Sequence, residues 1–579
     1  MFDPKFASLH DAFVRLGEER KVEGGTIIWA EGSPADELLL LEAGRIAALD
    51  ERPGSAARVV SVTRPGTVLG AVAFLTGQRQ PFTLTALRDT VLRALPRAKL
   101  EPLLHRQADL LAELAREALS LAREPHPSSH PRAAILGFVA VCDSVAVREM
   151  VEALAARMRL LGVKVAVLGA EFGEAASHAL SGIESRNDYV LMAAERAETE
   201  FTHYCGRQID RLFLVGSTQS PLPEGPLTFA AAAIQQHRLL DMIILQPADT
   251  RLPGDSARWM SAAPVARLFH VRHGAPDDLD RLARVLTGRS VAVVLSGGGA
   301  RAYAHIGVLK ALRELGVPVD LIGGTSMGAV IAAGAAIGWD AKEMDQRIRE
   351  AFVQTSPLSD IAFPPLLALT RGAEVDRRLL QHFGDVEISD LWLPFFCVST
   401  NLTTGLLKEH RAGRLRDALR ASISLPGVLP PVVVGGEVLV DGALVRNLPA
   451  DLMRERHDGL TIGVDVAEAA GLEPCDLELH PKGVRWLTSG GWLKGPPIVS
   501  VLIRSATLPT AKIMALGVSE HLDVLIAPTL DGIGLQDWKA YDRAVEAGYH
   551  ATMAMAPRIT ASAVRDPANP FGENPRGSG

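Results

Sequence analysis

The sequence predicts a multidomain chain with a β-rich domain at the N-terminus, a parallel α/β domain in the middle and a second α/β domain towards the C-terminus. Its 579 residues are too many for one hydrophobic core. Short apolar runs separated by turn residues fill the first part, whereas strand-like and helix-like patterns alternate in the two later parts. The predicted divisions are 1–123, 124–132 (a linker), 133–287, 288–556 and 557–579 (a disordered tail).

Composition narrows the classes of protein to which the chain can belong. Hydrophobic residues make up 47% and charged residues 22% of the chain, as in folded globular proteins. The formal net charge of −7 gives no indication of a nucleic-acid partner. The four cysteines lie far apart and form no CxxC pair, which argues against a disulfide framework or a structural zinc site. No secretory signal is visible, so we expect a cytoplasmic protein.

One uncharged stretch, from Leu321 to Trp339, has nearly the length of a transmembrane helix. Two glycines followed by Thr-Ser stand near its start and would interrupt a helix there. A buried strand that turns into a buried helix explains the stretch better than a membrane span does. We therefore predict no transmembrane segment.

The N-terminal domain has short apolar runs that are typical of strands in a small antiparallel barrel or sandwich. These runs are at 26–30, 38–41, 58–62, 68–69 and 83–87. The segment from Leu100 to Ala122 is rich in Leu, Ala, Glu and Arg, and it predicts one closing helix. The proline-rich segment that follows cannot continue this helix and predicts a linker.

The middle domain alternates apolar strands with helical patterns, which predicts a Rossmann-like α/β fold with a parallel sheet. The strands are expected at 134–141, 163–168, 189–192, 211–215 and 242–245. The first strand runs into Cys142-Asp143-Ser144, with neither a GxGxxG nor a GxxxxGK[ST] motif. A structural or interaction role is therefore favoured over nucleotide binding.

The strongest functional signal is the motif Gly324-Thr325-Ser326-Met327-Gly328 between a predicted strand and a predicted helix. In a strand–GxSxG–helix arrangement the serine lies on a sharp turn with its hydroxyl exposed, which predicts a nucleophile at Ser326. Side chains at Gly324 and Gly328 would collide with the turn and the following helix. Small residues after Gly328 allow that helix to lie close to the sheet.

A glycine-rich loop also lies between a predicted strand and a predicted helix. Its residues are Ser296, Gly297, Gly298, Gly299, Ala300 and Arg301. Three glycines free a row of backbone N–H groups, and the helix that follows adds positive potential. The loop lacks the lysine and hydroxyl of a phosphate-binding P-loop. Beside a serine nucleophile, an oxyanion hole is the better interpretation.

A serine nucleophile needs a base, and several residues are candidates. Asp441 ends a predicted hairpin at 432–440, where an isolated carboxylate is more often a turn residue than a base. A Ser-Asp-His triad would use a histidine that follows the acid in sequence, which leaves His457 and His480. His305 lies in the helix after the glycine loop, where packing or capping is the favoured role.

Together these motifs resemble the patatin-like phospholipases, whose serine works in a Ser–Asp dyad without histidine. The resemblance covers roughly residues 290–548 and includes three further segments: Thr400–Leu402, Ala421–Gly427 and Asn447–Pro449. It implies that Ser326 is the nucleophile and Asp441 the base, with the glycine loop as oxyanion hole. One departure is Ala302, where the family usually has glycine. The order of domains is similar to bacterial relatives of neuropathy target esterase.

The resemblance implies a serine esterase that hydrolyses fatty-acyl ester bonds of phospholipids or lysophospholipids without a metal or cofactor. Such a substrate implies a cytoplasmic protein that associates peripherally with the inner face of the membrane. The alternative is a weakly active or non-enzymatic module that senses a ligand and binds a membrane or a partner. The sequence carries no signal for an oligomeric state.

The first domain resembles a cyclic-nucleotide-binding barrel in its segments 25–28, 31–36 and 44–46. That family uses a glutamate for the ribose hydroxyl and an arginine for the cyclic phosphate. Ala71 stands at the glutamate position and Gln80 at the arginine position, next to Arg79. We therefore expect the barrel fold without a cyclic nucleotide ligand.

A nearly continuous apolar run, Ile361–Leu369, contains two prolines that argue against a long helix. Two interpretations stay open for it. The run is either a segment of the core or a flexible cover over the acyl site that touches the bilayer, since a substrate held in a membrane requires an apolar approach.

Overall fold

The structure is a computed structural model that describes residues 6, 8–50, 58–63, 65–123, 135–172, 177–184, 186–195, 200–221, 240–263, 265–354, 357–364, 367–467 and 520–563. The chain forms two compact units, each described here by itself. One comprises Met1–Thr250 and Arg258–Thr287, and the other comprises Arg251–Ala257 and Gly288–Gly579. The predicted linker at 124–132 lies outside the described residues.

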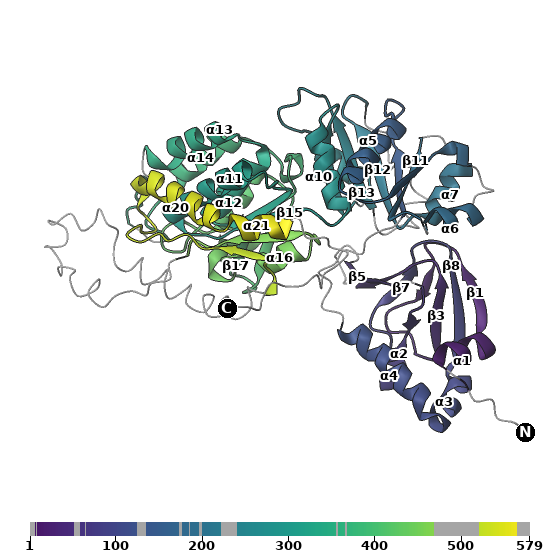
Figure 1. The fold of residues 1–579 in the computed structure, drawn as a ribbon. Coiled ribbons are helices and arrows are strands. Elements are labelled where there is room, and N and C mark those ends of the chain that lie inside the picture. Colours follow the sequence, from purple (N-terminus) through teal and green to yellow (C-terminus); the bar gives the residue numbers. More distant parts are fainter. Residues whose placement is uncertain are drawn as a thin grey trace, which may run out of the picture. The chain divides into compact units, whose positions relative to one another are not determined.

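The N-terminal domain is a β-barrel of two four-stranded sheets with helices at one end (Figure 1). One sheet has the order β1-β8-β3-β6 and consists of Glu18–Val22, Thr90–Pro96, Glu37–Ala43 and Val68–Leu69. The other has the order β2-β7-β4-β5 and consists of Ile27–Trp29, Thr83–Ala86, Ile46–Asp50 and Arg58–Thr63. The helices are α1 (Leu9–Leu16), α2 (Ala71–Thr76), α3 (Arg97–Arg106) and α4 (Ala108–Arg123). The predicted antiparallel β-rich fold is confirmed.

The single closing helix predicted at 100–122 is wrong, because two helices occupy this segment. The helix α3 ends before Gln107, whose backbone is extended and whose N–H bonds to the Leu103 carbonyl. The helix α4 then starts at Ala108. Both helices are rich in the same residue types, so composition alone could not indicate the break.

The middle domain has a six-stranded sheet in which all neighbouring strands described in the structure are parallel. Its order is β10-β11-β9-β12-β13-β14, with strands at Val165–Leu168, Tyr189–Ala194, Ile135–Ala140, Arg211–Ser217, Leu240–Gln246 and Arg267–Arg272. Its helices are α5 (Val147–Leu160), η1 (Ala170–Phe172), α6 (Ser177–Glu184), α7 (Glu200–Gln208), α9 (Ser256–Ala262) and α10 (Pro276–Leu286). The Rossmann-like prediction is therefore confirmed at the level of the fold class.

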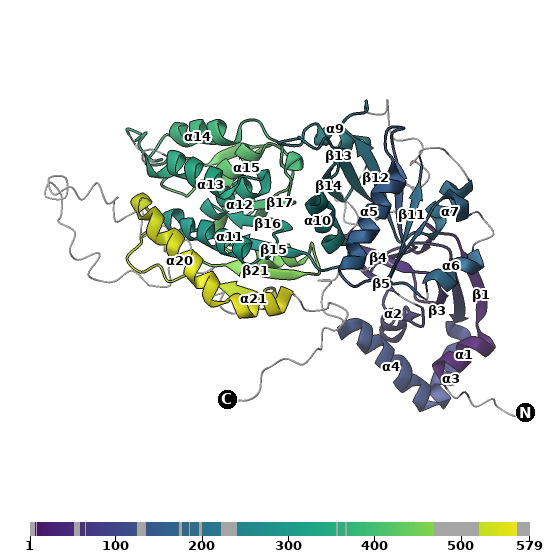
Figure 2. The same ribbon diagram turned by 45° about the horizontal axis from the view of Figure 1, so that its top comes forward.

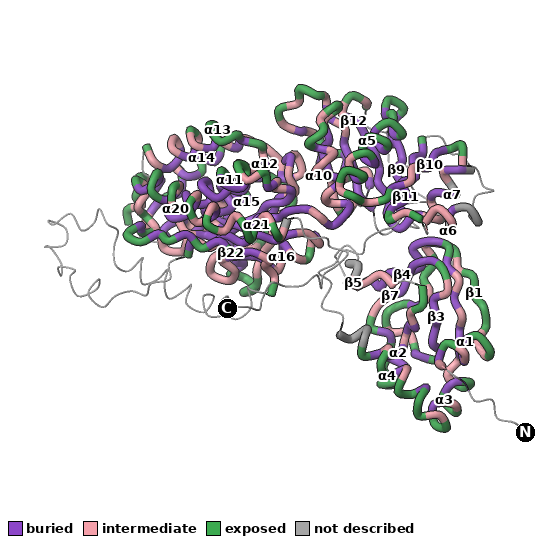
Figure 3. Tube along the Cα trace, in the orientation of Figure 1, coloured by how far each residue is buried: buried purple, intermediate pink, exposed green. Residues whose placement is uncertain are grey.

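The C-terminal domain has an eight-stranded mixed sheet of order β19-β20-β17-β16-β15-β21-β22, with β18 paired to β17. In that order the strands are Val432–Val434, Glu437–Asp441, Phe395–Asn401, Leu321–Thr325, Val291–Leu295, Leu460–Val464 and Val524–Ile526, and β18 is Leu407–His410. The four strands from β17 to β21 run parallel, and β15 lies among them with both faces covered. Figure 3 shows this buried interior.

Helices flank this sheet on both sides (Figure 2). In chain order they are η3 (Gly299–Tyr303), α11 (Ala304–Glu314), α12 (Met327–Ile337), α13 (Ala341–Ile348), η4 (Arg349–Val353), α14 (Ala373–Phe383), η5 (Ile388–Asp390), α15 (Leu415–Ser422), η6 (Gly442–Leu444), α16 (Ala450–Arg454), η9 (Trp538–Ala540), α20 (Tyr541–Ala554) and α21 (Ala556–Ala563). The helix α21 occupies the start of the predicted tail, because Ile559 is fully buried in the core. The remainder of that tail lies outside the described residues.

The apolar stretch 321–339 forms β16 and then α12, a buried helix of 11 residues. Among the helices that the structure describes, none combines the length and apolar character that crossing a bilayer requires.

The helices α11 and α20 cross at a pair of glycines. A Cβ atom on Gly307 would overlap the Val545 carbonyl oxygen, and one on Gly548 would overlap the Ala304 carbonyl oxygen. The two backbones are therefore in direct contact. Because α11 follows the glycine-rich loop, this crossing also supports the position of that loop.

We predict that Gly548→Ala destabilises the C-terminal unit. The new methyl group forces the two helices apart, and overpacking of this kind costs about 1–3 kcal/mol. The melting temperature of this unit should fall by roughly 2–5 °C in calorimetry. The control is Gly534→Ala, since a Cβ atom at that exposed position meets nothing within 4 Å. Equal melting temperatures for the two variants would contradict the direct backbone contact between α11 and α20.

Candidate active site

Ser326 lies on a strained turn between β16 and α12. Its φ of 53° and ψ of −130° are unusual for a residue with a side chain. A Cβ atom on Gly324 or on Gly328 would come within 2.7 Å of the Leu295 carbonyl oxygen. The turn can therefore pack directly against the end of β15 only because these two positions lack side chains.

The Ser326 hydroxyl donates a hydrogen bond of 2.6 Å to Oδ2 of Asp441. Asp441 is the last residue of β20, and β20 pairs with β17, the neighbour of the strand that leads to Ser326. The other carboxylate oxygen, Oδ1, accepts a hydrogen bond from the backbone N–H of Ala443 at 2.9 Å. Two residues that are 115 positions apart in sequence thus meet at the same end of the sheet.

The Asp441 carboxyl group is buried, with 2% of its surface exposed. Burial raises its pKa to about 6, although the hydrogen bonds from Ser326 and Ala443 favour the charged form. A carboxylate with a raised pKa is a better proton acceptor, while it remains mostly ionised at neutral pH. The geometry and the pKa therefore both suit a general base for the Ser326 hydroxyl.

The glycine-rich loop lies beside the nucleophile. A Cβ atom on Gly297 would be 3.0 Å from the Cβ of Ser326 and 2.7 Å from Oδ1 of Asn447. The Asn447 side chain accepts a hydrogen bond from the Gly297 N–H at 3.0 Å and donates one to the Gly297 carbonyl at 3.2 Å. Asn447 therefore fixes the start of the loop against Ser326.

Several N–H groups of the predicted oxyanion hole already have acceptors. The N–H of Gly297 is bonded to Asn447, that of Ala300 to the Leu535 carbonyl at 2.8 Å, and that of Arg301 to the Gly298 carbonyl at 3.0 Å. Within the described part of the chain, no acceptor is recorded for the N–H groups of Gly298 and Gly299. The geometry thus narrows the candidate oxyanion donors from five residues to two.

The Arg301 side chain is directed at backbone carbonyls and not at the Ser326 hydroxyl. Its Nε donates to the Val466 carbonyl at 2.8 Å, and its Nη1 donates to the carbonyls of Ile533 and Leu530 at 2.8 and 3.1 Å. The residue is buried. The Arg301 side chain therefore joins the loop to two distant segments of the chain.

None of the described candidate histidines contacts the dyad. Nε2 of His305 lies 2.8 Å from the Ser296 carbonyl oxygen, and burial lowers its pKa to about 4. His457 contacts the hydroxyls of Ser290 and Thr461, and burial lowers its pKa to about 3. Ser290 precedes β15, whereas Ser326 lies at the opposite end of this sheet. His480 lies outside the described residues.

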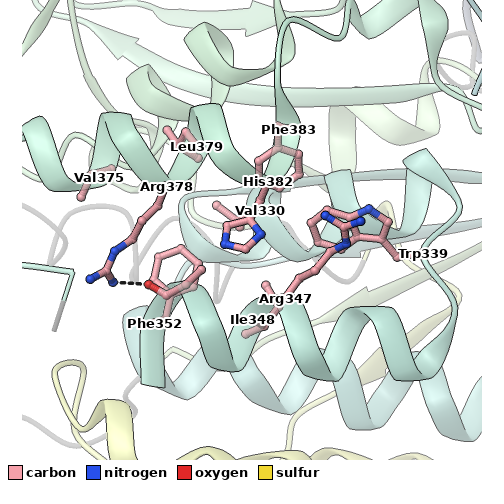
Figure 4. Close-up of a pocket in the computed structure, with 11 residues that line it drawn as sticks. Val330, Trp339, Arg347, Ile348, Phe352, Val375, Arg378, Leu379, His382 and Phe383 are labelled. Atoms are coloured by element: carbon pink, nitrogen blue, oxygen red, sulfur yellow. Dashed lines mark hydrogen bonds between the residues drawn. The ribbon is translucent and has the colours of Figure 1, made fainter. Parts of the chain in front are cut away.

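An apolar cavity lies one helical turn along α12 from Ser326, at Val330 (Figure 4). The rings of Trp339, Phe352 and Phe383 line it, together with aliphatic side chains of α13 and α14. Its buried arginine, Arg378, donates to the Ala351 carbonyl and to Glu374. The cavity wall is therefore mainly apolar, although Arg347 and His382 also contribute to it.

Two residues that position the site received no individual role from the sequence. Asn447 holds Gly297, and the Ser422 hydroxyl accepts a hydrogen bond from the Ser326 N–H at 3.0 Å. Both belong to segments on which the patatin resemblance rests, but their roles depend on contacts across 150 and 96 residues. Only the folded structure brings them to the loop and the turn.

Comparisons with known proteins agree with this site. The patatin-like phospholipase family matches residues 293–454, and the cyclic nucleotide-binding domain matches residues 19–107. The chain is 33% identical over 559 residues to an uncharacterized NTE family protein of Mycobacterium tuberculosis, covering 93% of this chain and 91% of that protein. This chain belongs to the NTE family. The predicted resemblance is therefore confirmed, and the C-terminal domain is a patatin-like phospholipase domain, a hydrolase.

Longer members of the NTE family are also similar to the chain. The human patatin-like phospholipase domain-containing protein 6 is 29% identical over 599 residues, and the lysophospholipase NTE1 of Yarrowia lipolytica is 25% identical over 632 residues. They align with 91% and 90% of this chain, respectively. The chain spans 44% of the length of each.

In the barrel of this NTE-family chain, Gly70 lies against the side chains of Trp29 and Gln80. A Cβ atom on Gly70 would be 2.9 Å from the Trp29 ring and 3.3 Å from Nε2 of Gln80. Trp29 is buried in the barrel core, and Gln80 is buried beside it. Arg79 is directed elsewhere, since its guanidinium donates to the Gly32 carbonyl at 2.6 Å.

We predict that kcat/KM for a short soluble ester decreases as the pH is lowered, with a midpoint near pH 6. Asp441 must be ionised to accept a proton, and burial moves its pKa from about 4 up to about 6. The rate should fall about tenfold per pH unit well below that midpoint. The measurement is kcat/KM against pH, with circular dichroism to confirm that the fold persists. A midpoint that stays near pH 4 would contradict this role of burial.

The barrel should bind neither cyclic AMP nor cyclic GMP at micromolar concentrations. Loss of the glutamate and arginine partners weakens binding by roughly two to four orders of magnitude. Calorimetric titration of the full chain with both nucleotides tests this expectation. Micromolar binding that disappears in Arg79→Ala would mean that the loop shifts and brings Arg79 to the phosphate, which is the opposite of our expectation.

Proposed function

We propose that the chain is a serine esterase that hydrolyses fatty-acyl ester bonds of phospholipids or lysophospholipids. The observation that carries this proposal is the 2.6 Å hydrogen bond from the Ser326 hydroxyl to the buried Asp441 carboxylate. It joins the nucleophile and a base of raised pKa in one unit, without a described histidine in contact. The membership of the NTE family and the patatin-like phospholipase domain supply the class of substrate.

In the proposed reaction, Asp441 accepts the Ser326 hydroxyl proton as Oγ attacks the ester carbonyl carbon. The N–H groups of Gly298 and Gly299 stabilise the negative charge that develops on the carbonyl oxygen. The positive ends of the helices that follow the two loops add to this effect. The C–O bond of the ester then breaks, and the leaving alcohol takes the proton from Asp441.

The acyl-enzyme is hydrolysed by the same groups in reverse. Water gives a proton to Asp441 and attacks the acyl carbon, and the fatty acid leaves as Ser326 Oγ regains its proton. All protons are accounted for by Ser326, Asp441 and water, so these steps use no further group.

A phospholipid or lysophospholipid substrate implies work at a membrane surface, and we propose peripheral association with the inner face of the membrane. The alternative is a weakly active or non-enzymatic module that binds a membrane or a partner. Fatty-acid release that disappears in Ser326→Ala favours the enzyme. Intact biological activity in that variant favours the module.

We expect Ser326→Ala and Asp441→Asn each to remove most esterase activity, by about 10³-fold or more. The double variant should be little worse than either single variant, because members of one catalytic unit are not additive. Fatty-acid release from a panel of phospholipids and lysophospholipids measures the effect. A fluorophosphonate probe should label the wild-type chain and leave Ser326→Ala unlabelled.

Two controls separate this dyad from other assignments. Ser144→Ala removes an exposed serine of the other compact unit and should retain labelling and activity. His457→Ala tests the triad alternative and should retain activity if the protein stays folded. Labelling of another serine, or loss of activity in a folded His457→Ala variant, would show that the dyad assignment is wrong.

A further inference from the structure

Exposed apolar side chains are found on three segments of the hydrolase domain. The first segment, here called the strap, is the described part of the apolar run, residues 361–364 and 367–369. Its Phe363 is 91% and its Leu367 78% exposed. The second is the turn at 402–406, where Leu406 is 66% exposed. The third is the hairpin of β19 and β20, where Val433 is 69% exposed. The core interpretation of the strap is therefore wrong for these side chains.

The turn and the hairpin lie at the same end of the sheet as Ser326. The strands β16 and β17 run parallel, with Thr325 opposite Val398, so both strands leave the sheet at this end. β17 extends beyond that level to Asn401, which pairs with Leu439 of β20. Hydrogen bonds join the turn to the hairpin, from the Leu402 N–H to the Val438 carbonyl and from the Val438 N–H to the Thr403 hydroxyl.

The strap is joined to the dyad through a short piece of chain. The N–H groups of Leu369 and Thr370 donate to the carbonyls of Gly427 and Val428. Gly427 follows five residues after Ser422, whose hydroxyl accepts the Ser326 N–H. Five residues span at most about 18 Å, so the base of the strap lies within that distance of Ser422. The turn and the hairpin thus lie at the end of the sheet that holds the nucleophile, and the base of the strap is bonded to the segment that follows Ser422.

We propose that the strap, the turn and the hairpin form one apolar rim that inserts into the surface of a phospholipid membrane and brings Ser326 to the ester bonds there. This inference rests on the proposed function, because the substrate class identifies the occupant. Large exposed apolar patches mark sites of membrane or protein contact. The exposed Arg371 lies two residues after the strap and supplies a cation for lipid phosphates.

Insertion at the level of the headgroups matches the chemistry of the site. The ester bonds of a phospholipid lie at the boundary between headgroups and acyl chains, and interfacial apolar groups enter a bilayer to a depth of about 5–10 Å. The rim side chains then replace water around the ester as it approaches the dyad. A substrate that is already soluble needs no such step, so the rim should affect only lipid aggregates.

The test measures vesicle binding of the full chain in a Ser326→Ala background, so that turnover plays no part. Flotation uses vesicles of phosphatidylcholine with one-fifth phosphatidylglycerol. Phe363→Ser with Leu367→Ser should lower the partition coefficient by roughly 10- to 100-fold, and Leu402→Ser with Leu406→Ser should lower it as well. Leu525→Ser is the matched control, since Leu525 is 42% exposed on β22 at the opposite edge of the sheet, and its binding should be unchanged.

The same double substitutions with Ser326 intact should reduce hydrolysis of vesicle lipid and leave hydrolysis of a short soluble ester within about twofold. If a serine variant damages the fold, Phe363→Trp gives an independent result, because its added fluorescence should shift to shorter wavelength when vesicles are added. A tryptophan at Leu525 should show no such shift.

Unchanged vesicle binding in both rim pairs, or no spectral shift of Phe363→Trp, would overturn the rim. A change in oligomeric state in light scattering, with vesicle binding unchanged, would mean that a second copy of the chain covers this surface, and it would also overturn the proposal. Failure of the proposed esterase function would give a different result, because lipid turnover would then be retained in Ser326→Ala.

Discussion

The contact of the Ser326 turn with the end of β15 is the constraint on which the rest of the site depends. A residue with a side chain at φ 53° stores about 1–3 kcal/mol, and such strain persists only where the surroundings hold it. Here α12 is almost entirely buried, and Gly324 and Gly328 let it pack on bare backbone. The half-buried nucleophile therefore lies on a turn whose strain is offset by the burial of the helix that follows it.

Long-range polar contacts then limit what each group of the site can do. Asn447 and Leu535 occupy N–H groups of the glycine loop, so that two adjacent N–H groups stay unbonded within the described chain. Arg301 joins the loop to carbonyls more than 160 residues away. Burial, with no cationic partner among the described residues, raises the pKa of Asp441. Which N–H groups of the loop can serve as oxyanion donors thus depends on their hydrogen-bond partners and not on the loop sequence.

The sequence was sufficient to predict the elements that local pattern determines: the GxSxG turn, the glycine loop, the hairpin and the order of three fold types. It could not predict the roles of Asn447 and Ser422, because these depend on contacts between distant segments. The break at Gln107 and the strand Arg267–Arg272 have no distinct composition or apolar run. An apolar run such as 361–369 also does not indicate whether its side chains face the core or solvent.

The central position of β15 has a consequence for synthesis of the chain. One neighbour, β16, follows within 30 residues, but the other, β21, begins at Leu460, which is 165 residues after Leu295 (460 − 295). A ribosome adds about 5–20 residues per second, so the second neighbour emerges roughly 10–30 s later. During this time an apolar strand edge is available to other nascent chains. A strand that is buried in the finished sheet therefore keeps one edge unpaired for many seconds while the chain is being made.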